Sequence, residues 1–239
     1  MPELYLSVII PAYNEEKRIG DTIRYMIDYL RRQNYASEII VVDDGSRDRT
    51  VAVAEKSLAD FRHTLLKNEI NRGKGYSVRR GMLEGRGKFL LFSDADMSTP
   101  IEEVEGFIRH LESGEDAVIA SRAVLGARVE KHQPFLRENL GRVYNVIARL
   151  VAFQTVMDSQ CGFKCFKREV ARDLFGRQKL ERFSFDAEIV YLAQRRGYKL
   201  IEKPVIWRDS PAGRVKMLTD PLNMLTDLVR IRWLHRDLK

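Results

Sequence analysis

Two aspartates separated by one residue stand in the stretch KFLLFSDADMS, directly after an apolar run. The run from Phe89 to Phe92 is about as long as one buried strand requires, so Asp94 and Asp96 are expected where that strand leaves the core. Two like charges so close repel, which indicates that something positive lies between them. Carboxylates at positions i and i+2 of a turn can both reach one hard divalent cation, and Mg²⁺ or Mn²⁺ usually takes further ligands from a substrate diphosphate.

The elements that must position these aspartates alternate along the first 120 residues. We expect strands over 4–12, 38–44, 64–67, 89–94 and 116–121, and helices over 17–32, 50–58, 76–84 and 101–111. Strands that alternate with helices of this size predict βαβ units and a mostly parallel central sheet flanked by helices, which is an α/β fold. In such a sheet, ligands bind beyond the carboxyl ends of the strands.

Three of the expected strands end in acidic or polar residues. The first ends in PAYNEE, the second in VVDDGS and the fourth in SDADMS. Because parallel strands share one carboxyl edge, these three segments should meet there. One acidic strand end is an ordinary loop, whereas three that converge on one edge predict a site.

The remaining sequence is less regular. We expect helices over 137–153 and 186–195, a strand over 199–207, and a basic amphipathic helix with Trp233 from Met217 to the end. No internal repeat, low-complexity segment or linker divides the chain. The sequence therefore predicts one domain over 1–216, followed by a C-terminal helix over 217–239.

The composition restricts the class of protein. Of the 239 residues, 44% are hydrophobic and 31% are charged, which is typical of a soluble globular protein. The net charge of +7 favours anionic partners such as phosphates, nucleic acid or an acidic membrane surface. The longest uncharged run has 11 residues, whereas a membrane-spanning helix needs roughly 20 apolar ones. Cys161 and Cys165 are the only cysteines and lack a nearby histidine, so we expect two reduced packing residues rather than a disulfide framework or a zinc site.

The motifs VIIPAYNEE, IIVVDDGSRDRT, NRGKG and SDADMSTP, in this order and spacing, resemble the family 2 glycosyltransferases with the GT-A fold. The blocks HQPFLRENLGRVYN and MDSQCGFKCF are similar to those of the polyprenyl-phosphate glycosyltransferases. NRGKG together with DSQCGFK is most similar to the dolichyl-phosphate β-glucosyltransferases, followed by the dolichyl-phosphate mannose synthases. The resemblance covers about residues 5–216, and it implies an inverting, metal-dependent transfer of a sugar to polyprenyl or dolichyl phosphate.

The resemblance also implies roles for individual residues of the donor site. The loop after the first strand would hold the base and ribose of a nucleotide sugar, the second strand end would complete the nucleotide site, and the aspartate motif would bind the diphosphate and, through Asp94 and Asp96, the metal. The residues concerned are Pro11, Tyr13 and Glu15 in the first segment, Val42 and Asp44 in the second, and Asp94, Ala95 and Asp96 in the third. Lys74 of NRGKG would approach the donor.

Arg122 and Arg137 match arginines that such enzymes use around the acceptor phosphate. A lipid phosphate is already anionic at neutral pH, so its attack on the anomeric carbon needs little help from a general base. It needs positioning and charge compensation, which guanidinium groups supply bidentately, while the metal stabilises the departing nucleoside diphosphate. We therefore expect Asp96, Arg122 and Arg137 to be catalytic in a single displacement with inversion.

Two alternatives stay open. Transfer to a sugar hydroxyl would need a base, and the nearest candidates are Asp158, which could instead brace its loop, and Asp186, which could instead cap or face a helix. A basic module that binds nucleotides or nucleic acid without catalysis would show steeply salt-dependent binding. The acidic strand ends would repel nucleic acid from the edge where ligands bind, so we expect no nucleic-acid partner.

The chain departs from the family pattern near the acceptor phosphate. Gly141 stands where mannose synthases commonly have a serine. Late in the chain, Gly213 and Lys216 match the pattern G-x-S-K, but its serine and the arginine that often precedes it are missing. Arg208 or Arg214 could supply the missing charge.

The acceptor and donor raise two further expectations. The resemblance is to proteins of which the eukaryotic ones carry an N-terminal membrane anchor and some bacterial or archaeal ones carry C-terminal spans. This sequence shows neither, so we expect peripheral docking on the cytoplasmic face of a membrane through the helices over 137–153 and 217–239. The same helices could instead pack on the domain or form a homodimer contact. The family likeness favours UDP-glucose as the donor over UDP-N-acetylglucosamine and GDP-mannose.

Overall fold

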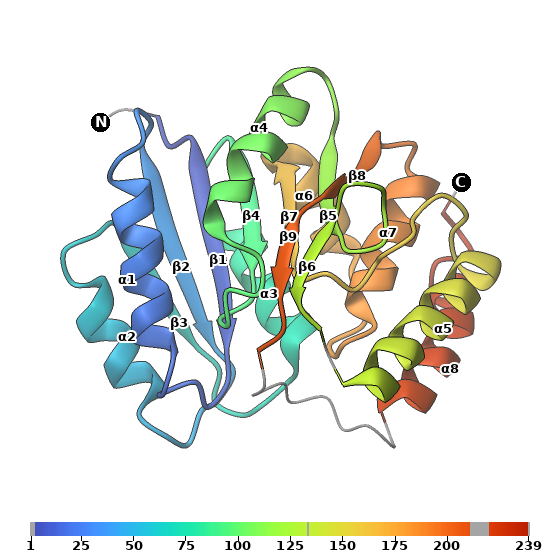
Figure 1. The fold of residues 1–239 in the computed structure, drawn as a ribbon, viewed down its shortest axis with the longest axis horizontal. Coiled ribbons are helices and arrows are strands. Elements are labelled where there is room, and N and C mark those ends of the chain that lie inside the picture. The colour runs from blue at the N-terminus through green and yellow to red at the C-terminus, as the bar shows by residue number, and fades with distance from the viewer. Residues whose placement is uncertain (1–2, 133, 211–219, 239) are drawn as a thin grey trace.

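The computed structural model describes residues 3–132, 134–210 and 220–238. A seven-stranded sheet forms the middle layer, with helices on both faces and the strand order β3-β2-β1-β4-β7-β5-β8 (Figure 1). Its strands are β1 (Leu6–Ala12), β2 (Ser37–Asp43), β3 (His63–Lys67), β4 (Phe89–Ser93), β5 (Ala117–Ser121), β7 (Phe163–Lys167) and β8 (Leu200–Pro204). A separate two-stranded sheet pairs β6 (Arg128–Lys131) with β9 (Ile206–Arg208) in parallel.

The helices cover the sheet in two layers. They are α1 (Ile19–Leu30), α2 (Thr50–Leu58), α3 (Lys74–Glu84), α4 (Val104–Glu112), α5 (Phe135–Val151), α6 (Arg168–Arg177), α7 (Phe185–Arg195) and α8 (Asp220–Leu234), with a short 3₁₀ turn η1 (Ile101–Glu103) before α4. One buried cluster joins α1, α2 and α4 to one face of the sheet. A second cluster joins α3, α6 and α7 to the other face.

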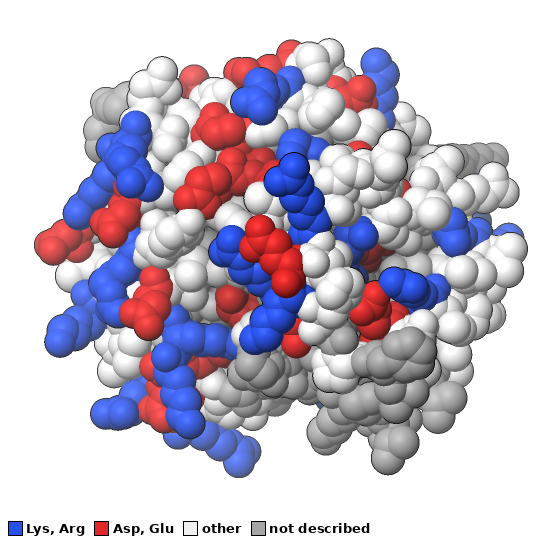
Figure 2. Space-filling model, viewed as in Figure 1, with Lys and Arg blue, Asp and Glu red and all other residues white. Residues whose placement is uncertain are grey.

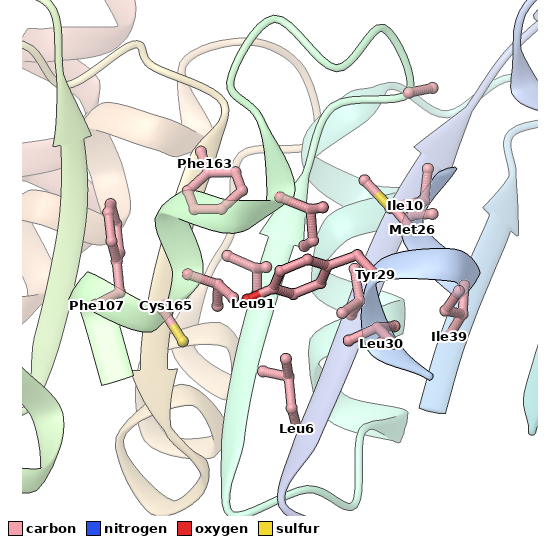
Figure 3. Packing of buried hydrophobic residues seen from close by; sticks show 14 of the residues in the cluster. Leu6, Ile10, Met26, Tyr29, Leu30, Ile39, Leu91, Phe107, Phe163 and Cys165 are labelled. Carbon is pink, nitrogen blue, oxygen red and sulfur yellow. The ribbon is translucent and has the colours of Figure 1, made fainter. Parts of the chain in front are cut away.

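The buried strands carry nearly continuous apolar runs because both of their faces are covered. Side chains alternate along β1, so that Leu6 and Ile10 face α1 while Ile9 faces α3. Figure 3 shows the first of these faces, where Leu6, Ile10 and Leu91 meet Met26 and Tyr29 of α1. Each face of the sheet therefore packs against its own buried apolar cluster, and this packing fixes the positions of the strand ends.

Parallel pairing brings the three polar strand ends together. Strand β1 pairs in parallel with β2 on one side and with β4 on the other. Their carboxyl ends consequently lie at one edge of the sheet. The expected α/β architecture with a mostly parallel central sheet is confirmed.

The structure corrects the sequence interpretation at the centre of the sheet. Strand β7 was not expected, and it runs antiparallel between β4 and β5. Its segment FKCFK ends in Lys167 and carries Lys164 between Phe163 and Cys165, which conceals the pattern of a buried strand. Strand β6 and helix α6 were also missed, and the strand expected over 199–207 is divided at Val205 into β8 and β9.

The C-terminal helix α8 packs against α5 and α7. Leu228 and Ile231 are fully buried in a third apolar cluster with residues of these two helices. His235, just after the helix, lies with Nε2 2.6 Å from Oε1 of Glu188, and both side chains are buried. The helix is therefore anchored to the domain on this side.

Other apolar residues of α8 remain at the surface. Val229 and Trp233 are 63% and 62% exposed. The expected helix start at Met217 and the boundary between 216 and 217 lie outside the described residues. Among the residues that are described, no helix is both long and apolar enough to cross a membrane.

Candidate active site

The loops after β1 and β2 are tied together by hydrogen bonds. The amide of Asp44 donates to the carbonyl oxygen of Ala12 at 2.8 Å. The amide of Asn14 donates to Oγ of Ser46 at 2.8 Å, and that of Glu15 donates to Oγ1 of Thr50 at 2.6 Å. The two segments expected to hold a nucleotide thus form one continuous edge.

The aspartate pair lies in a tight turn directly after β4. Met97 has a positive φ of 51°, and its amide donates to the carbonyl oxygen of Asp94 at 3.3 Å. The amide of Ser98 donates to Oδ1 of Asp96 at 3.0 Å. Burial raises the pKa of Asp96 and the charge of Asp94 raises it further, while hydrogen bonds from Ser98 and the charge of Arg18 act in the opposite direction. Two neighbouring carboxylates, one of them largely buried, are stabilised in their charged form by a nearby cation.

Gly162 lies against the carboxylate of Asp94. The amide of Asp94 donates to the carbonyl oxygen of Gly162 at 3.0 Å. A Cβ added at Gly162 would lie 1.9 Å from Oδ2 of Asp94. Only glycine fits here without moving the carboxylate, which gives a physical reason for the glycine of the CGFKCF motif.

Lys74 contacts the same aspartate from α3. Its Nζ lies 2.6 Å from Oδ1 of Asp94. Burial by itself lowers the pKa of Lys74, but the charges of Asp94 and Asp186 outweigh burial, so the pKa is raised and the ammonium group stays charged. The lysine of NRGKG is therefore brought to the metal motif.

Asp44 holds the loop that carries this lysine. Its side chain is buried and accepts hydrogen bonds from the amide of Arg72 at 3.0 Å and from the amide of Gly73 at 2.8 Å. Nδ2 of Asn68 adds a third bond at 2.8 Å. Two residues that the sequence assigned separately, Asp44 and Lys74, are thus parts of one arrangement.

A buried ion pair between β7 and α7, which the sequence analysis missed, lies in the interior of the domain next to the site. Nζ of Lys164 is paired with Oδ1 of Asp186 and donates to the carbonyl oxygen of Cys161 at 2.7 Å. Burial raises the pKa of Asp186, against the charges of Lys164 and Lys74. A lysine in the apolar segment FKCFK and an aspartate in FSFDAEIV were the available signal, because buried charges must be paired. Asp186 thus bonds a lysine of the sheet and not the start of its own helix.

Arg18 is a second residue that was missed. Its guanidinium group pairs with both carboxylate oxygens of Glu15 and donates from Nη1 to Oγ of Ser210 at 2.7 Å. Nη1 also lies 4.0 Å from Oδ2 of Asp96. The spacing of three residues between Glu15 and Arg18 at a helix start was the signal in the sequence.

Arg122 is fixed by Asp158 after the end of β5. Nε and Nη2 of Arg122 donate to Oδ2 and Oδ1 of Asp158 at 2.7 and 2.9 Å, and the amide of Arg122 donates to Oδ2 at 3.0 Å. Burial alone would raise the pKa of Asp158, but the charge and hydrogen bonds of Arg122 lower it to about 2. The guanidinium group also lies 5.1 Å from the ring centre of Trp207. Asp158 is therefore an ionised brace for the arginine.

The other predicted residues take different positions. Ala95 is buried in the first core cluster and Val42 in the second, so their side chains pack in the interior of the domain. Pro11 is paired with Val42 across β1 and β2, and Tyr13 follows Ala12, the last residue of β1. Both are partly buried.

Two groups of residues predicted to bind the acceptor phosphate have side chains outside the described part of the structure. Arg137 lies in the first turn of α5, but its side chain is outside the described residues. The segment 212–216, with Gly213, Arg214 and Lys216, is also outside them. Arg208 forms a surface ion pair with Glu130, with Nε 2.6 Å from Oε2.

The geometry agrees with what sequence comparison finds. The sequence pattern of the family described as "Glycosyl transferase family 2" matches residues 7–175 of this chain. The chain belongs to this family. It is a glycosyltransferase, as the motifs at the three strand ends predicted.

Curated relatives named dolichyl-phosphate beta-glucosyltransferase align with nearly the whole chain. The Drosophila melanogaster protein is 37% identical over 244 residues, which cover 96% of this chain and 75% of the relative. The Dictyostelium discoideum protein is 34% identical over 245 residues, covering 96% and 74%. The human protein is 32% identical over 248 residues, covering 97% and 76%. The predicted similarity to this group is confirmed.

Solved structures share the fold at low sequence identity. Mannosyl-3-phosphoglycerate synthase from Rubrobacter xylanophilus superimposes with a TM-score of 0.71 at 20% identity, over 99% of this chain and 74% of that one. Glucosyl-3-phosphoglycerate synthase from Mycobacterium tuberculosis, in complex with Mn²⁺, UDP-glucose and phosphoglyceric acid, gives 0.68 at 20% identity, over 95% and 78%. The expected GT-A fold is thereby confirmed.

Proposed function

We propose that this protein transfers glucose from UDP-glucose to dolichyl phosphate or a related polyprenyl phosphate, with inversion at the anomeric carbon. The observation that carries the proposal is the cluster of Asp94 and Asp96 with Lys74 and Arg18 at the carboxyl edge of β1, β2 and β4. Paired carboxylates beside two cationic side chains suit a metal-bound diphosphate. The names of the relatives supply the sugar and the acceptor.

Asp94 and Asp96 are the residues that would hold Mg²⁺ or Mn²⁺. Their carboxylate oxygens suit a hard cation, and the burial of Asp96 beside a second carboxylate leaves a charge for it to balance. Within 3–132, 134–210 and 220–238, no group of three or more His, Cys, Asp or Glu residues is placed to hold a metal. A cation at the pair would therefore take its other ligands from the diphosphate and water. When bound, it would stabilise the charge of the departing nucleoside diphosphate.

Arg122 is the residue that would position the acceptor phosphate. Asp158 and Trp207 hold its guanidinium group, and the charge of Asp94 acts on it, so the arginine lies within electrostatic reach of the donor site. A fixed guanidinium group can bind a phosphate without rearranging. The acceptor is already ionised, so the enzyme has to orient it and balance its charge.

The hydroxyl-acceptor alternative receives less support from the candidate bases. Asp158 is bonded to Arg122, and Asp186 is bonded to Lys164 inside the domain. A general base must reach the proton it removes, and both carboxylates already have partners. The second alternative, a basic module that binds nucleotides or nucleic acid without catalysis, expects a continuous basic surface. Figure 2 shows instead Lys and Arg interspersed with Asp and Glu on the face that carries α1, α2 and α4.

The acceptor lipid requires the protein to reach a membrane surface, and we assign this role to α5 together with α8. One side of α5 exposes four apolar residues, and α8 adds two more; they are Leu140, Val143, Val146, Leu150, Val229 and Trp233. Arg142, which is ion-paired with Glu138, and Arg149, which contacts Met157, add positive charge on the same helix that would attract anionic headgroups. We propose peripheral docking on the cytoplasmic face through this surface, and a homodimer contact through the same surface is the competing outcome.

A transfer assay with separate donors tests the proposal. Purified protein receives radiolabelled UDP-glucose, UDP-N-acetylglucosamine or GDP-mannose with Mg²⁺ or Mn²⁺ and a short polyprenyl phosphate. Label should enter the organic phase with UDP-glucose. Label that enters the lipid from another donor would assign a different sugar and leave the proposed reaction class unchanged. Slow release of free sugar without lipid labelling would keep the donor site and contradict the acceptor assignment.

A further inference from the structure

Four charged side chains of alternating sign connect the interior of the domain with the aspartate pair. Lys164 of β7 is paired with Asp186 of α7, and both are buried. The charges of Asp94 and Asp186 both act on Lys74 of α3. Nζ of Lys74 lies 2.6 Å from Oδ1 of Asp94. Each carboxylate in this series thus already has a positive neighbour from the protein itself.

The backbone holds Lys74 in this position. Gly73 has a φ of +114°, and a Cβ at Gly75 would lie 2.7 Å from Cβ of Phe185. The start of α3 is therefore pressed against the segment that leads into α7. Nζ of Lys74 also lies 5.9 Å from the ring centre of Phe92, whose π face attracts a cation.

A divalent cation at the aspartate pair would meet the ammonium group of Lys74. Oδ1 of Asp94 is in contact with Nζ of this lysine, so a cation sharing the carboxylate would have a like charge beside it. Like charges at such separations repel strongly in a partly buried site. If Lys74 moved away, its other carboxylate neighbour would be Asp186, which Lys164 already occupies. An anion that enters at this edge would give the ammonium group a new partner.

We propose that Lys74 is a built-in counter-ion that makes metal binding depend on the nucleotide sugar. The inference rests on the donor and metal sites of the proposed function. Without a donor, Lys74 neutralises Asp94 and opposes a divalent cation. With a donor, the diphosphate becomes the partner of the ammonium group and leaves Asp94 to the cation. Because linkage between two binding sites is reciprocal, the metal then raises donor affinity by the same factor.

Mn²⁺ binding measured by electron paramagnetic resonance, with and without UDP, tests this directly. The Mn²⁺ held by free UDP is measured without protein and subtracted. Lys74→Gln should bind Mn²⁺ alone about tenfold more tightly than the wild type, because a competing charge is removed. The factor by which UDP strengthens Mn²⁺ binding should shrink by about the same amount. Lys74→Arg, which keeps the charge, should behave like the wild type.

Two further variants make the comparison specific. Lys67→Gln removes the same charge from an exposed lysine that pairs with Glu55 at the surface, and it should leave Mn²⁺ binding unchanged. Lys74→Met, with an apolar side chain of similar length, should reproduce the effect of Lys74→Gln. Thermal unfolding gives a second readout, because Mn²⁺ alone should stabilise Lys74→Gln more than the wild type.

The failures of the two proposals can be told apart. If Lys74→Gln and Lys74→Met bind Mn²⁺ alone as weakly as the wild type, or more weakly, Lys74 is not a counter-ion that opposes the metal. Wild-type protein that binds no Mn²⁺ even with UDP would instead contradict the proposed metal and donor sites.

Discussion

Gly162 and Asp94 lie so close that no side chain fits between them. A Cβ at residue 162 would be 1.9 Å from Oδ2 of the aspartate, and the amide of Asp94 bonds the carbonyl oxygen of the glycine. This contact joins the start of β7, which is antiparallel to β4 and β5, to the end of β4. It also explains how a motif about 70 residues away in the sequence can determine the geometry of the metal motif.

Gly162→Ala should therefore displace the carboxylate of Asp94 while the domain still folds. Displacements of about 1 Å in a catalytic site can cost on the order of a hundredfold in rate, and we expect a loss of at least about that size in kcat/KM. Steady-state transfer assays together with circular dichroism measure both properties. Gly176→Ala, in α6 with nothing within 4 Å of the added Cβ, is the matched control and should keep full activity. Wild-type activity in Gly162→Ala would show that the contact does not matter.

The brace between Asp158 and Arg122 predicts how stability depends on pH. The pKa of Asp158 is about 2 in the folded protein, against an ordinary value of 3.8. Because the folded pKa is lower, the ionised carboxylate stabilises the protein above about pH 4, and this contribution disappears as the pH falls towards 2. The free energy of unfolding should lose about 2 kcal/mol from this group between pH 5 and pH 2.

Asp158→Asn removes this contribution, and urea unfolding at several pH values measures it. The variant should be less stable at pH 7 by about 2 kcal/mol or more, because Arg122 loses its partner. Its stability should fall less steeply below pH 5 than that of the wild type. Asp21→Asn, at an exposed aspartate, should keep the wild-type slope. Equal slopes for Asp158→Asn and the wild type would contradict the assigned ion pair.

Replacement of Arg122 distinguishes an enzyme that uses a phosphate acceptor from one that uses a hydroxyl acceptor. Arg122→Gln should lower kcat/KM for polyprenyl phosphate at least about a hundredfold, while slow release of glucose from UDP-glucose continues. The family resemblance predicts the same for Arg137→Gln. Arg24→Gln, at an exposed arginine of α1 that is ion-paired with Asp21, is the control that should retain activity. Normal lipid transfer by Arg122→Gln would remove this residue from the acceptor site.

The exposed apolar side of α5 should bind anionic membranes. Replacing Val143 and Leu150 together by Glu should abolish co-sedimentation with vesicles of phosphatidylcholine and phosphatidylglycerol, because it removes apolar contact and adds repulsion. Leu125→Glu, at a residue that is 99% exposed elsewhere, should bind as the wild type does. If the double variant binds vesicles normally but changes a dimer into a monomer in light scattering, the surface is a contact between two copies.

The sequence predicted those parts of the protein that follow from local patterns. The alternation of apolar runs and helical segments was enough to predict β1, β2 and β4 in parallel. It also placed Asp44 and Asp94 at one edge of the sheet. These predictions needed only the periodicity of each segment and the rule that parallel strands share an edge.

The parts that were missed depend on pairs that are distant in sequence. Strand β7 is interrupted by Lys164, whose charge is acceptable only because Asp186 lies opposite it in the folded domain. Arg18 was not singled out, because its contacts with Asp96 and Ser210 join residues that are distant in the sequence. The signal that such pairs leave in the sequence is local, a charge within an apolar run for Lys164 and the spacing from Glu15 for Arg18, and it does not identify the distant partner.

Asp96 provides the most direct test of the central claim, a transfer reaction that depends on a metal at the end of β4. Transfer of label from UDP-glucose to polyprenyl phosphate would be measured for the wild type and Asp96→Asn, with Mn²⁺ and with excess chelator. We predict that chelator abolishes wild-type transfer, and that Asp96→Asn folds normally but loses at least about a hundredfold in rate at saturating Mn²⁺. Wild-type transfer that chelator does not reduce, or an Asp96→Asn variant that remains active, would contradict this account.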